Sequence, residues 1–126
     1  MKIGLGRKLF LIYKIVRAPL GLSFAFVLMY GTFAGNLSAP LLLAAFGSFL
    51  VELFAAIYND YCDYKEDVRN KRTDKMILAG LLSRNQMKNI YFLIAAAALV
   101  SLWFTNFFIL LFGIYYLIIS KYIYHN

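Results

Sequence analysis

Residues 41–67 read LLLAAFGSFLVELFAAIYNDYCDYKED, a stretch that joins a long apolar run directly to a dense acidic one. The apolar part, residues 41–58, contains a single charged side chain, Glu52. A helix needs about 20 mostly apolar residues to cross the hydrocarbon core of a bilayer. The stretch therefore predicts a membrane-spanning helix that ends in a polar, acidic segment.

The composition of the whole chain agrees with this prediction. Of its 126 residues, 63% are hydrophobic and only 15% are charged, whereas soluble domains are about 45–50% apolar. This composition excludes an ordinary soluble domain. The length suffices for about four crossings and therefore excludes a large multi-helix carrier. The net charge of +7 does not indicate nucleic acid, since basic residues in a membrane chain fix topology and contact anionic lipids of the bilayer.

Two more uncharged stretches lie on either side of this region. Residues 20–35 form the first predicted span, and residues 90–120 are uncharged over 31 positions, about 46 Å as a helix. That is too long for one straight crossing, so we expect a helical hairpin with its turn near Trp103, Thr105 and Asn106, where an indole and polar side chains suit an interface. A single tilted or kinked crossing is the alternative.

The predicted fold is thus an all-α, polytopic transmembrane bundle of about four spans. Residues 1–18 alternate basic and apolar side chains, which favours an amphipathic helix at the headgroup surface that ends before Pro19. The thirteen basic residues lie within residues 1–18, within residues 59–89 and at Lys121, and none lies between residues 31 and 40. The positive-inside rule places the amino terminus and the 59–89 loop in the cytoplasm, with the protein integral to the cell membrane.

Five of the six acidic residues lie between positions 60 and 74. If the second helix continues past Tyr58, Asn59, Asp63 and Asp67 recur every four residues on one face, with Asp60 beside them. Such carboxylates repel one another, and a bound cation would reverse the sign of the interaction. Their oxygen ligands suit Mg²⁺, which is commonly shared with phosphate groups. The alternative is a solvated helix end that pairs with the following basic loop.

That loop begins with residues 69–75, RNKRTDK. Basic side chains next to a carboxylate and metal site are what a diphosphate requires, because Mg²⁺ bridges some of its oxygens and Arg or Lys neutralises the rest. The apolar helices would hold an attached hydrocarbon tail. Positive-inside topology alone also explains basic residues at this position.

These residues carry a resemblance to a known family. The pattern Asn59-Asp60-x-x-Asp63-x-x-x-Asp67, followed by residues 71–75 and Gly80, resembles the first aspartate-rich motif of the UbiA superfamily of intramembrane prenyltransferases. The resemblance implies Mg²⁺-dependent transfer of a prenyl group from a prenyl diphosphate to a lipophilic acceptor, of aromatic or glycerol-ether type. It also implies that Asp63 and Asp67 are catalytic, and it assigns the metal and diphosphate to Asn59, Asp63 and Asp67 with Asp60 in support. By the same resemblance, we expect contact with the diphosphate, or closure of the loop over it, from Lys71, Arg72 and Asp74.

The chain also departs from the family pattern. Family members are nine-helix bundles with a second aspartate-rich motif in a later cytoplasmic loop, and no residue after Asp74 is acidic here. The family's Arg-Pro pair is loosened to Arg17-Ala18-Pro19, and Met76 follows Asp74-Lys75 where the family has proline. Half of a two-metal site is expected to catalyse poorly. We therefore expect a truncated prenyltransferase, residues 1–126 forming one partial domain, that is inactive alone or works with a complementing carboxy-terminal half.

The alternative from another functional class is a small non-catalytic four-helix membrane protein, or an assembly partner, whose acidic and basic residues form a salt-bridged loop. Glu52 has a place in both hypotheses. It lies on the same helical face as Asn59, and a charged carboxylate at that depth in the membrane costs free energy unless it is protonated or partnered. In the prenyltransferase hypothesis Glu52 lines the substrate cavity. In the alternative it is a neutral, hydrogen-bonded group that faces another helix, for instance near Ser23 or Ser48. Tyr61 and Tyr64 border the prenyl chain or anchor the helix at the interface.

Overall fold

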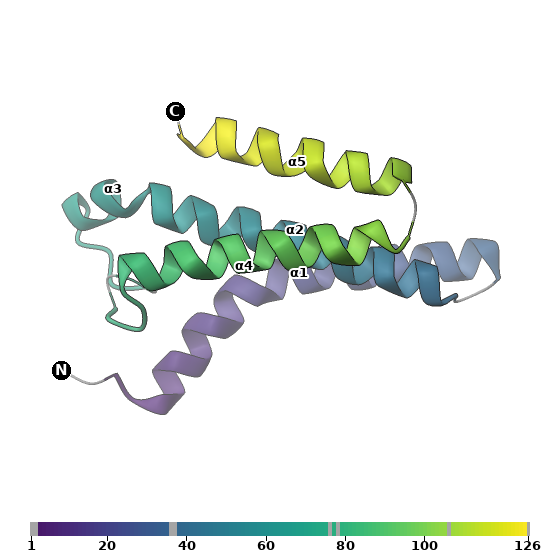
Figure 1. Ribbon diagram of the computed structural model, residues 1–126. Coiled ribbons are helices and arrows are strands. Elements are labelled where there is room, and N and C mark those ends of the chain that lie inside the picture. Colours follow the sequence, from purple (N-terminus) through teal and green to yellow (C-terminus); the bar gives the residue numbers. More distant parts are fainter. Residues whose placement is uncertain (1–2, 36–37, 76, 78, 106, 126) are drawn as a thin grey trace.

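The computed structural model describes residues 3–35, 38–75, 77, 79–105 and 107–125, and within these residues the protein consists of helices without strands (Figure 1). This confirms the predicted all-α fold. Helix α2 contacts each of the other four, so it forms the centre of the bundle. The helices are α1 (Leu5–Ala34), α2 (Ala39–Cys62), α3 (Tyr64–Arg69), α4 (Arg84–Trp103) and α5 (Phe107–His125).

Two of the described helices, α2 and α4, are long and apolar enough to cross a membrane. The apolar part of α5, Leu110–Ile123, is shorter. Helix α4 ends at Trp103, and α5 runs back beside it (Figure 1). The predicted helical hairpin is therefore confirmed, with Thr105 at the turn, where its backbone N–H and its hydroxyl both donate to the Leu102 carbonyl. Asn106 lies outside the described residues.

Helix α1 differs from the expected arrangement. It is continuous from Leu5 to Ala34, with Pro19 inside it, so the boundary predicted before Pro19 is not a break in the helix. Proline lacks the N–H that would bond the carbonyl four residues earlier, and its ring displaces that carbonyl, which bends a helix. Figure 1 shows α1 changing direction along its length. The location of residues 5–18 at the membrane surface stays a prediction.

Helix α2 continues almost unbroken into α3, as expected for the acidic segment. Asp63 lies between the two helices with φ −77° and ψ 0°, yet helical hydrogen bonds pass through it. The Asp63 N–H donates to the Asn59 carbonyl at 2.9 Å, and the Asp67 N–H donates to the Asp63 carbonyl at 2.8 Å. Asn59, Asp63 and Asp67 therefore follow one another at a spacing of one helical turn.

Helix α4 begins earlier than its apolar run. The Ser83 side chain accepts from the Gln86 N–H, and the Gln86 side chain accepts from the Ser83 N–H, a reciprocal capping box that starts the helix at Arg84. The irregular part of the chain between α3 and α4 is accordingly shorter than the loop predicted over residues 59–89. That predicted loop comprises the end of α2, α3 and a connecting segment, the 70–83 loop, which is irregular over the described residues 70–75, 77 and 79–83.

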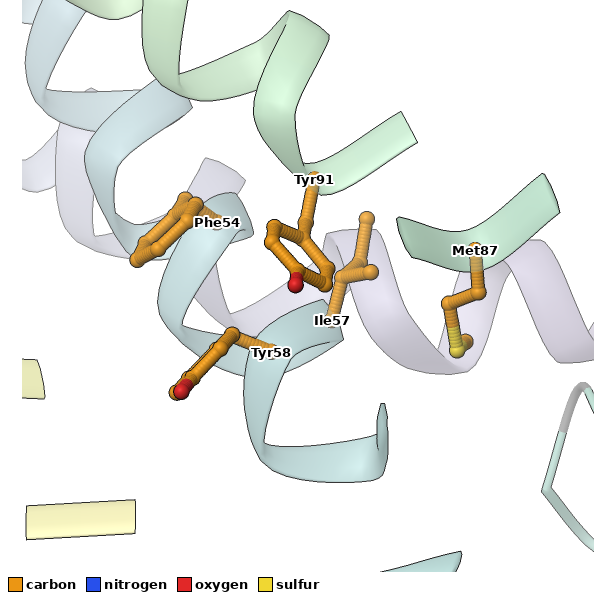
Figure 2. Packing of buried hydrophobic residues seen from close by; sticks show 5 residues of the cluster. All are labelled: Phe54, Ile57, Tyr58, Met87 and Tyr91. Carbon is orange, nitrogen blue, oxygen red and sulfur yellow. The ribbon is translucent and has the colours of Figure 1, made fainter. Parts of the chain in front are cut away.

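Aromatic rings of α2 and α4 form the core nearest the acidic segment (Figure 2). Phe54 and Tyr58 stack on one face of α2 with ring centroids 5.5 Å apart, and Tyr91 of α4 meets both rings edge-on. Met87 is fully buried beside them. Edge-to-face contacts of this kind add to the free energy gained by burying the rings, so the core holds α4 against the end of α2 that carries the acidic residues.

The bundle has two distinct ends (Figure 1). The start of α1, α3 and the end of α5 lie at one end. The end of α1 with the start of α2, and the end of α4 with the start of α5, lie at the other. Because the three basic segments share one end, the arrangement agrees with a bundle that keeps its positive charge on one side of a membrane.

Candidate functional site

The acidic segment, residues 59–67 at the end of α2 and in α3, contains a carboxylate with one oxygen that the described part of the chain leaves without a partner. Asp67 of α3 is only 6% exposed, and its Oδ2 atom has no hydrogen-bond partner within the described part of the chain. A buried polar atom without a partner destabilises a fold by about 1–3 kcal/mol, and more if it is charged. An external cation would satisfy this oxygen.

Asp60, by contrast, is already paired. Its Oδ1 atom accepts from the Lys75 ammonium at 2.7 Å, and the side chains are only 11% and 22% exposed. Burial lowers the pKa of Lys75, but the hydrogen bond and charge of Asp60 outweigh that effect and raise the pKa above its usual value. Asp60 therefore fixes the 70–83 loop onto α2.

Asp74 is paired twice. Its two oxygens accept from Nε and Nη2 of Arg72, each at 2.7 Å, and it also contacts the ammonium of Lys14 in α1. The hydrogen bonds from Arg72, and then from Lys14, hold the pKa of Asp74 well below its usual range. Arg72 and Asp74, both predicted to contact a diphosphate, therefore bind one another, and Arg72 keeps an exposed face toward solvent.

Two basic residues of α1 join this region, in roles that sequence reasoning missed. The Arg7 Nη2 atom donates to the Thr73 carbonyl at 2.9 Å, and Lys14 binds Asp74. Each pair is separated by at least 60 positions, so no helical spacing could have connected them. From the sequence alone, both residues count only toward the amphipathic charge of residues 1–18.

The turn that follows α3 places Lys71 in the left-handed region, with φ 53°. A non-glycine residue in this region is uncommon and strained, and such residues often occur at functional sites. The turn is held because the Lys71 N–H donates to Val68 and the Arg72 N–H donates to Asp67. Lys71 itself is exposed. Gly80, the glycine of the family pattern, has φ 77°, which explains why glycine suits that position.

The donor set fits Mg²⁺ only in company with other ligands. In the described part of the chain, no three His, Cys, Asp or Glu side chains gather closely enough to hold a metal ion by themselves. Asp60 binds Lys75 through Oδ1, whereas Asn59, Asp63 and Asp67 take part in none of the ion pairs among the described residues. Mg²⁺ is usually bound by one or two carboxylates together with waters and substrate phosphates, and this set meets that description.

Glu52 lies away from this group. It lines a cavity of about 120 Å³ between α2, α4 and α5, together with Ser48, Leu102 and Tyr116. A cavity of that size is too small for a long hydrocarbon tail. Leu102 and Tyr116 belong to α4 and α5, whereas Ser48 lies one turn earlier on the same helix as Glu52. Glu52 therefore faces neighbouring helices, and its role stays a prediction.

Tyr61 and Tyr64 both contact the side chain of Arg84, a contact that the spacing of these residues in the sequence does not predict. The guanidinium of Arg84, the first residue of α4, lies 4.7 Å from the ring centre of Tyr61 and 5.5 Å from that of Tyr64. These distances are within the range of cation–π attraction. The two rings thus attach the start of α4 to the acidic segment.

Comparisons with known proteins identify the family of the chain. No curated protein and no solved structure matches the chain. A family model does match: it describes the UbiA prenyltransferase family and covers residues 20–125, which include all of the acidic segment and the 70–83 loop. The chain is thus a helical membrane protein that belongs to the UbiA prenyltransferase family.

Proposed function

We propose that this chain binds a prenyl diphosphate through Mg²⁺ and forms the diphosphate-binding part of an enzyme that transfers the prenyl group to a lipophilic acceptor. Family membership supports prenyl transfer in general. The observation that supports the specific proposal is the buried Asp67, one helical turn beyond Asp63, whose Oδ2 atom has no hydrogen-bond partner among the described residues. The acceptor class, aromatic or glycerol-ether, is a further proposal drawn from the family.

The residues have distinct tasks in this proposal. Asn59, Asp63 and Asp67 hold Mg²⁺, which when bound neutralises diphosphate charge and so makes diphosphate a better leaving group. Lys71 and the exposed face of Arg72 bind the remaining phosphate oxygens as the allylic carbon–oxygen bond breaks. Asp74 positions Arg72 for this contact.

The ion pairs around the site hold the 70–83 loop in place. Lys75 attaches the loop to Asp60 on α2, and Lys14 and Arg7 attach it to α1. A loop positioned before substrate arrives loses less conformational entropy on binding. These side chains act by positioning and do not themselves touch the substrate.

A complete reaction centre requires a second acidic group. No acidic residue follows Asp74 within residues 1–126, so we propose that a complementing carboxy-terminal half supplies it. We also propose that the site faces the cytoplasm, because the basic segments gather at its end of the bundle.

Mg²⁺-dependent binding of farnesyl or geranylgeranyl diphosphate to the purified protein in detergent tests the proposal. We expect saturable binding that EDTA abolishes and that Asp63→Asn and Asp67→Asn each weaken strongly. Glu66→Gln is the matched control, since Glu66 is an exposed acidic residue of the same short helix. Equal binding by all four proteins, or no binding by the native chain, would contradict a working site.

A second function rests on a separate observation. Asp60 and Asp74 are both neutralised by the protein's own cations, which is what a non-catalytic membrane protein with a salt-bridged loop requires. In that case the folded state needs no ligand, and Mg²⁺ with prenyl diphosphate leaves the melting temperature unchanged. A rise in melting temperature that requires both Mg²⁺ and the diphosphate favours the prenyltransferase function instead.

A further inference from the structure

A groove on another side of the bundle has features that the proposed prenyl transfer does not use. It measures about 440 Å³ and lies between α2, α4 and α5. Its wall is aromatic and aliphatic, with Phe54, Tyr58, Tyr91 and Leu117 among its residues. Two lysines, Lys88 and Lys121, complete it.

The antiparallel course of α4 and α5 brings these lysines together. Lys88 lies near the start of α4 and Lys121 near the end of α5, and both line the same groove. Within the described residues neither lysine forms an ion pair, and no carboxylate lines the groove. The groove therefore combines an apolar wall with two uncompensated positive charges.

The groove is separate from the acidic site. Tyr61 lines it, whereas Asp63 stands two positions further along the same chain, about 200° around a helix. Asp63 follows the last residue of α2 and helical hydrogen bonds pass through it, so the Tyr61 and Asp63 side chains leave opposite sides of this helical segment. None of the carboxylates assigned to Mg²⁺ lines the groove.

The position of the lysines along the bundle indicates the kind of ligand. The start of α4 and the end of α5, which carry them, lie toward the end of the bundle with the basic loop (Figure 1). In a spanning bundle this is the level of lipid headgroups. Basic pockets between membrane helices at this level attract anionic headgroups, and the apolar wall suits an acyl chain.

We propose that this groove binds an anionic phospholipid, with the phosphate between Lys88 and Lys121 and an acyl chain along the aromatic wall of α2 and α4. Charge complementarity argues for this occupant over a neutral lipid or an apolar helix. The bound lipid joins α5 to the α2–α4 pair at the end where the acidic site lies.

Native mass spectrometry of the full chain in a neutral detergent tests the proposal, with phosphatidylglycerol and phosphatidylcholine as probes. We expect phosphatidylglycerol to bind more tightly than phosphatidylcholine. Lys88→Gln and Lys121→Gln should each weaken phosphatidylglycerol binding about fivefold, and the double variant about 30-fold. Lys88→Arg with Lys121→Arg should retain binding, and Lys8→Gln with Lys65→Gln, which removes two exposed charges elsewhere, should have no effect.

Several results would overturn the proposal. These are unchanged phosphatidylglycerol binding in the Lys88→Gln and Lys121→Gln double variant, equal binding of the two lipids, or competition by soluble glycerol phosphate as effective as that of the intact lipid. Displacement of phosphatidylglycerol by farnesyl diphosphate would also overturn it, because the groove would then belong to the prenyl diphosphate site. Since the lipid test needs no Mg²⁺, its failure is distinguishable from failure of the proposed prenyl transfer.

Discussion

Lys14 of α1 and Asp74 of the 70–83 loop form an ion pair across 60 positions of the chain. Through this pair, the loop beside the acidic site is attached to the first helix as well as to α2. Among the described helices α1 packs only on α2, so the loop is the second connection between α1 and the rest of the bundle. The tilt of α1 and the position of the loop are therefore coupled.

Asp74→Asn is expected to release the loop without unfolding the protein. Lys14 and Asp74 are each exposed by about a third, and ion pairs of this exposure contribute about 0–1 kcal/mol. Amide hydrogens of residues 71–75 should exchange faster in the variant, and those of α4 should not change. Glu66→Gln controls for the lost charge, and identical exchange in the loop of Asp74→Asn and the native protein would contradict the coupling.

The same pair predicts a pH dependence. The hydrogen bonds of Arg72 and Lys14 lower the pKa of Asp74, so the ionised form stabilises the folded state. This contribution is complete above the ordinary pKa of about 4 and is lost as the pH falls through the lower folded-state pKa. The difference in melting temperature between the native protein and Asp74→Asn should be constant above about pH 5 and shrink in more acidic buffer. A difference that grows on acidification would refute the assignment.

Local sequence patterns predict some features of this bundle and leave others open. The hairpin turn at Thr105 was predictable because the uncharged run is too long for one crossing and contains one polar break, and the one-turn spacing from Asn59 to Asp67 follows from helical periodicity alone. The continuation of α1 through Pro19 was not predictable, because proline both ends and bends helices. The pairings of Lys14 and Arg84 depend on which helices pack together, and local spacing carries no such information.

The Asp60–Lys75 pair is expected to matter more for stability than the Asp74 pairs, because both of its side chains are largely buried. Lys75→Met should leave Asp60 without its partner and lower the free energy of unfolding by about 1–3 kcal/mol. Adding Asp60→Asn should recover much of the loss, since no uncompensated charge remains. Chemical denaturation in mixed micelles measures both changes. The single variant Asp60→Asn completes the comparison. If the loss of unfolding free energy in the double variant equals the sum of the losses in the two single variants, the residues do not interact as the structure shows.

Close packing at Gly47 provides a test of the bundle core. A Cβ atom at this position would lie 2.5 Å from the Leu102 side chain, whereas a Cβ at Gly21 of α1 meets nothing within 4 Å. Gly47→Ala should therefore destabilise the protein by about 1–3 kcal/mol through overpacking. Gly21→Ala, the same substitution in an open position, should stabilise it by about 0.5–1 kcal/mol, because alanine favours a helix. Thermal melting compares the two, and a shift of the same sign in both would contradict the close approach of α2 and α4 at Gly47.

Asp67 is where stability and binding should oppose one another. Its buried Oδ2 atom has no hydrogen-bond partner among the described residues, so Asp67→Asn removes the charge of a buried carboxylate that lacks a full set of hydrogen bonds. We expect the variant to be more stable than the native protein without ligand, by about 1–3 kcal/mol, and to lose Mg²⁺-dependent binding of prenyl diphosphate. In EDTA, Asp67→Asn should therefore melt at a higher temperature than the native protein. In Mg²⁺ with farnesyl diphosphate, the native protein should melt at the higher temperature. A variant that is less stable in EDTA would mean that the fold already stabilises the Asp67 carboxylate, and would contradict a cation site at this position.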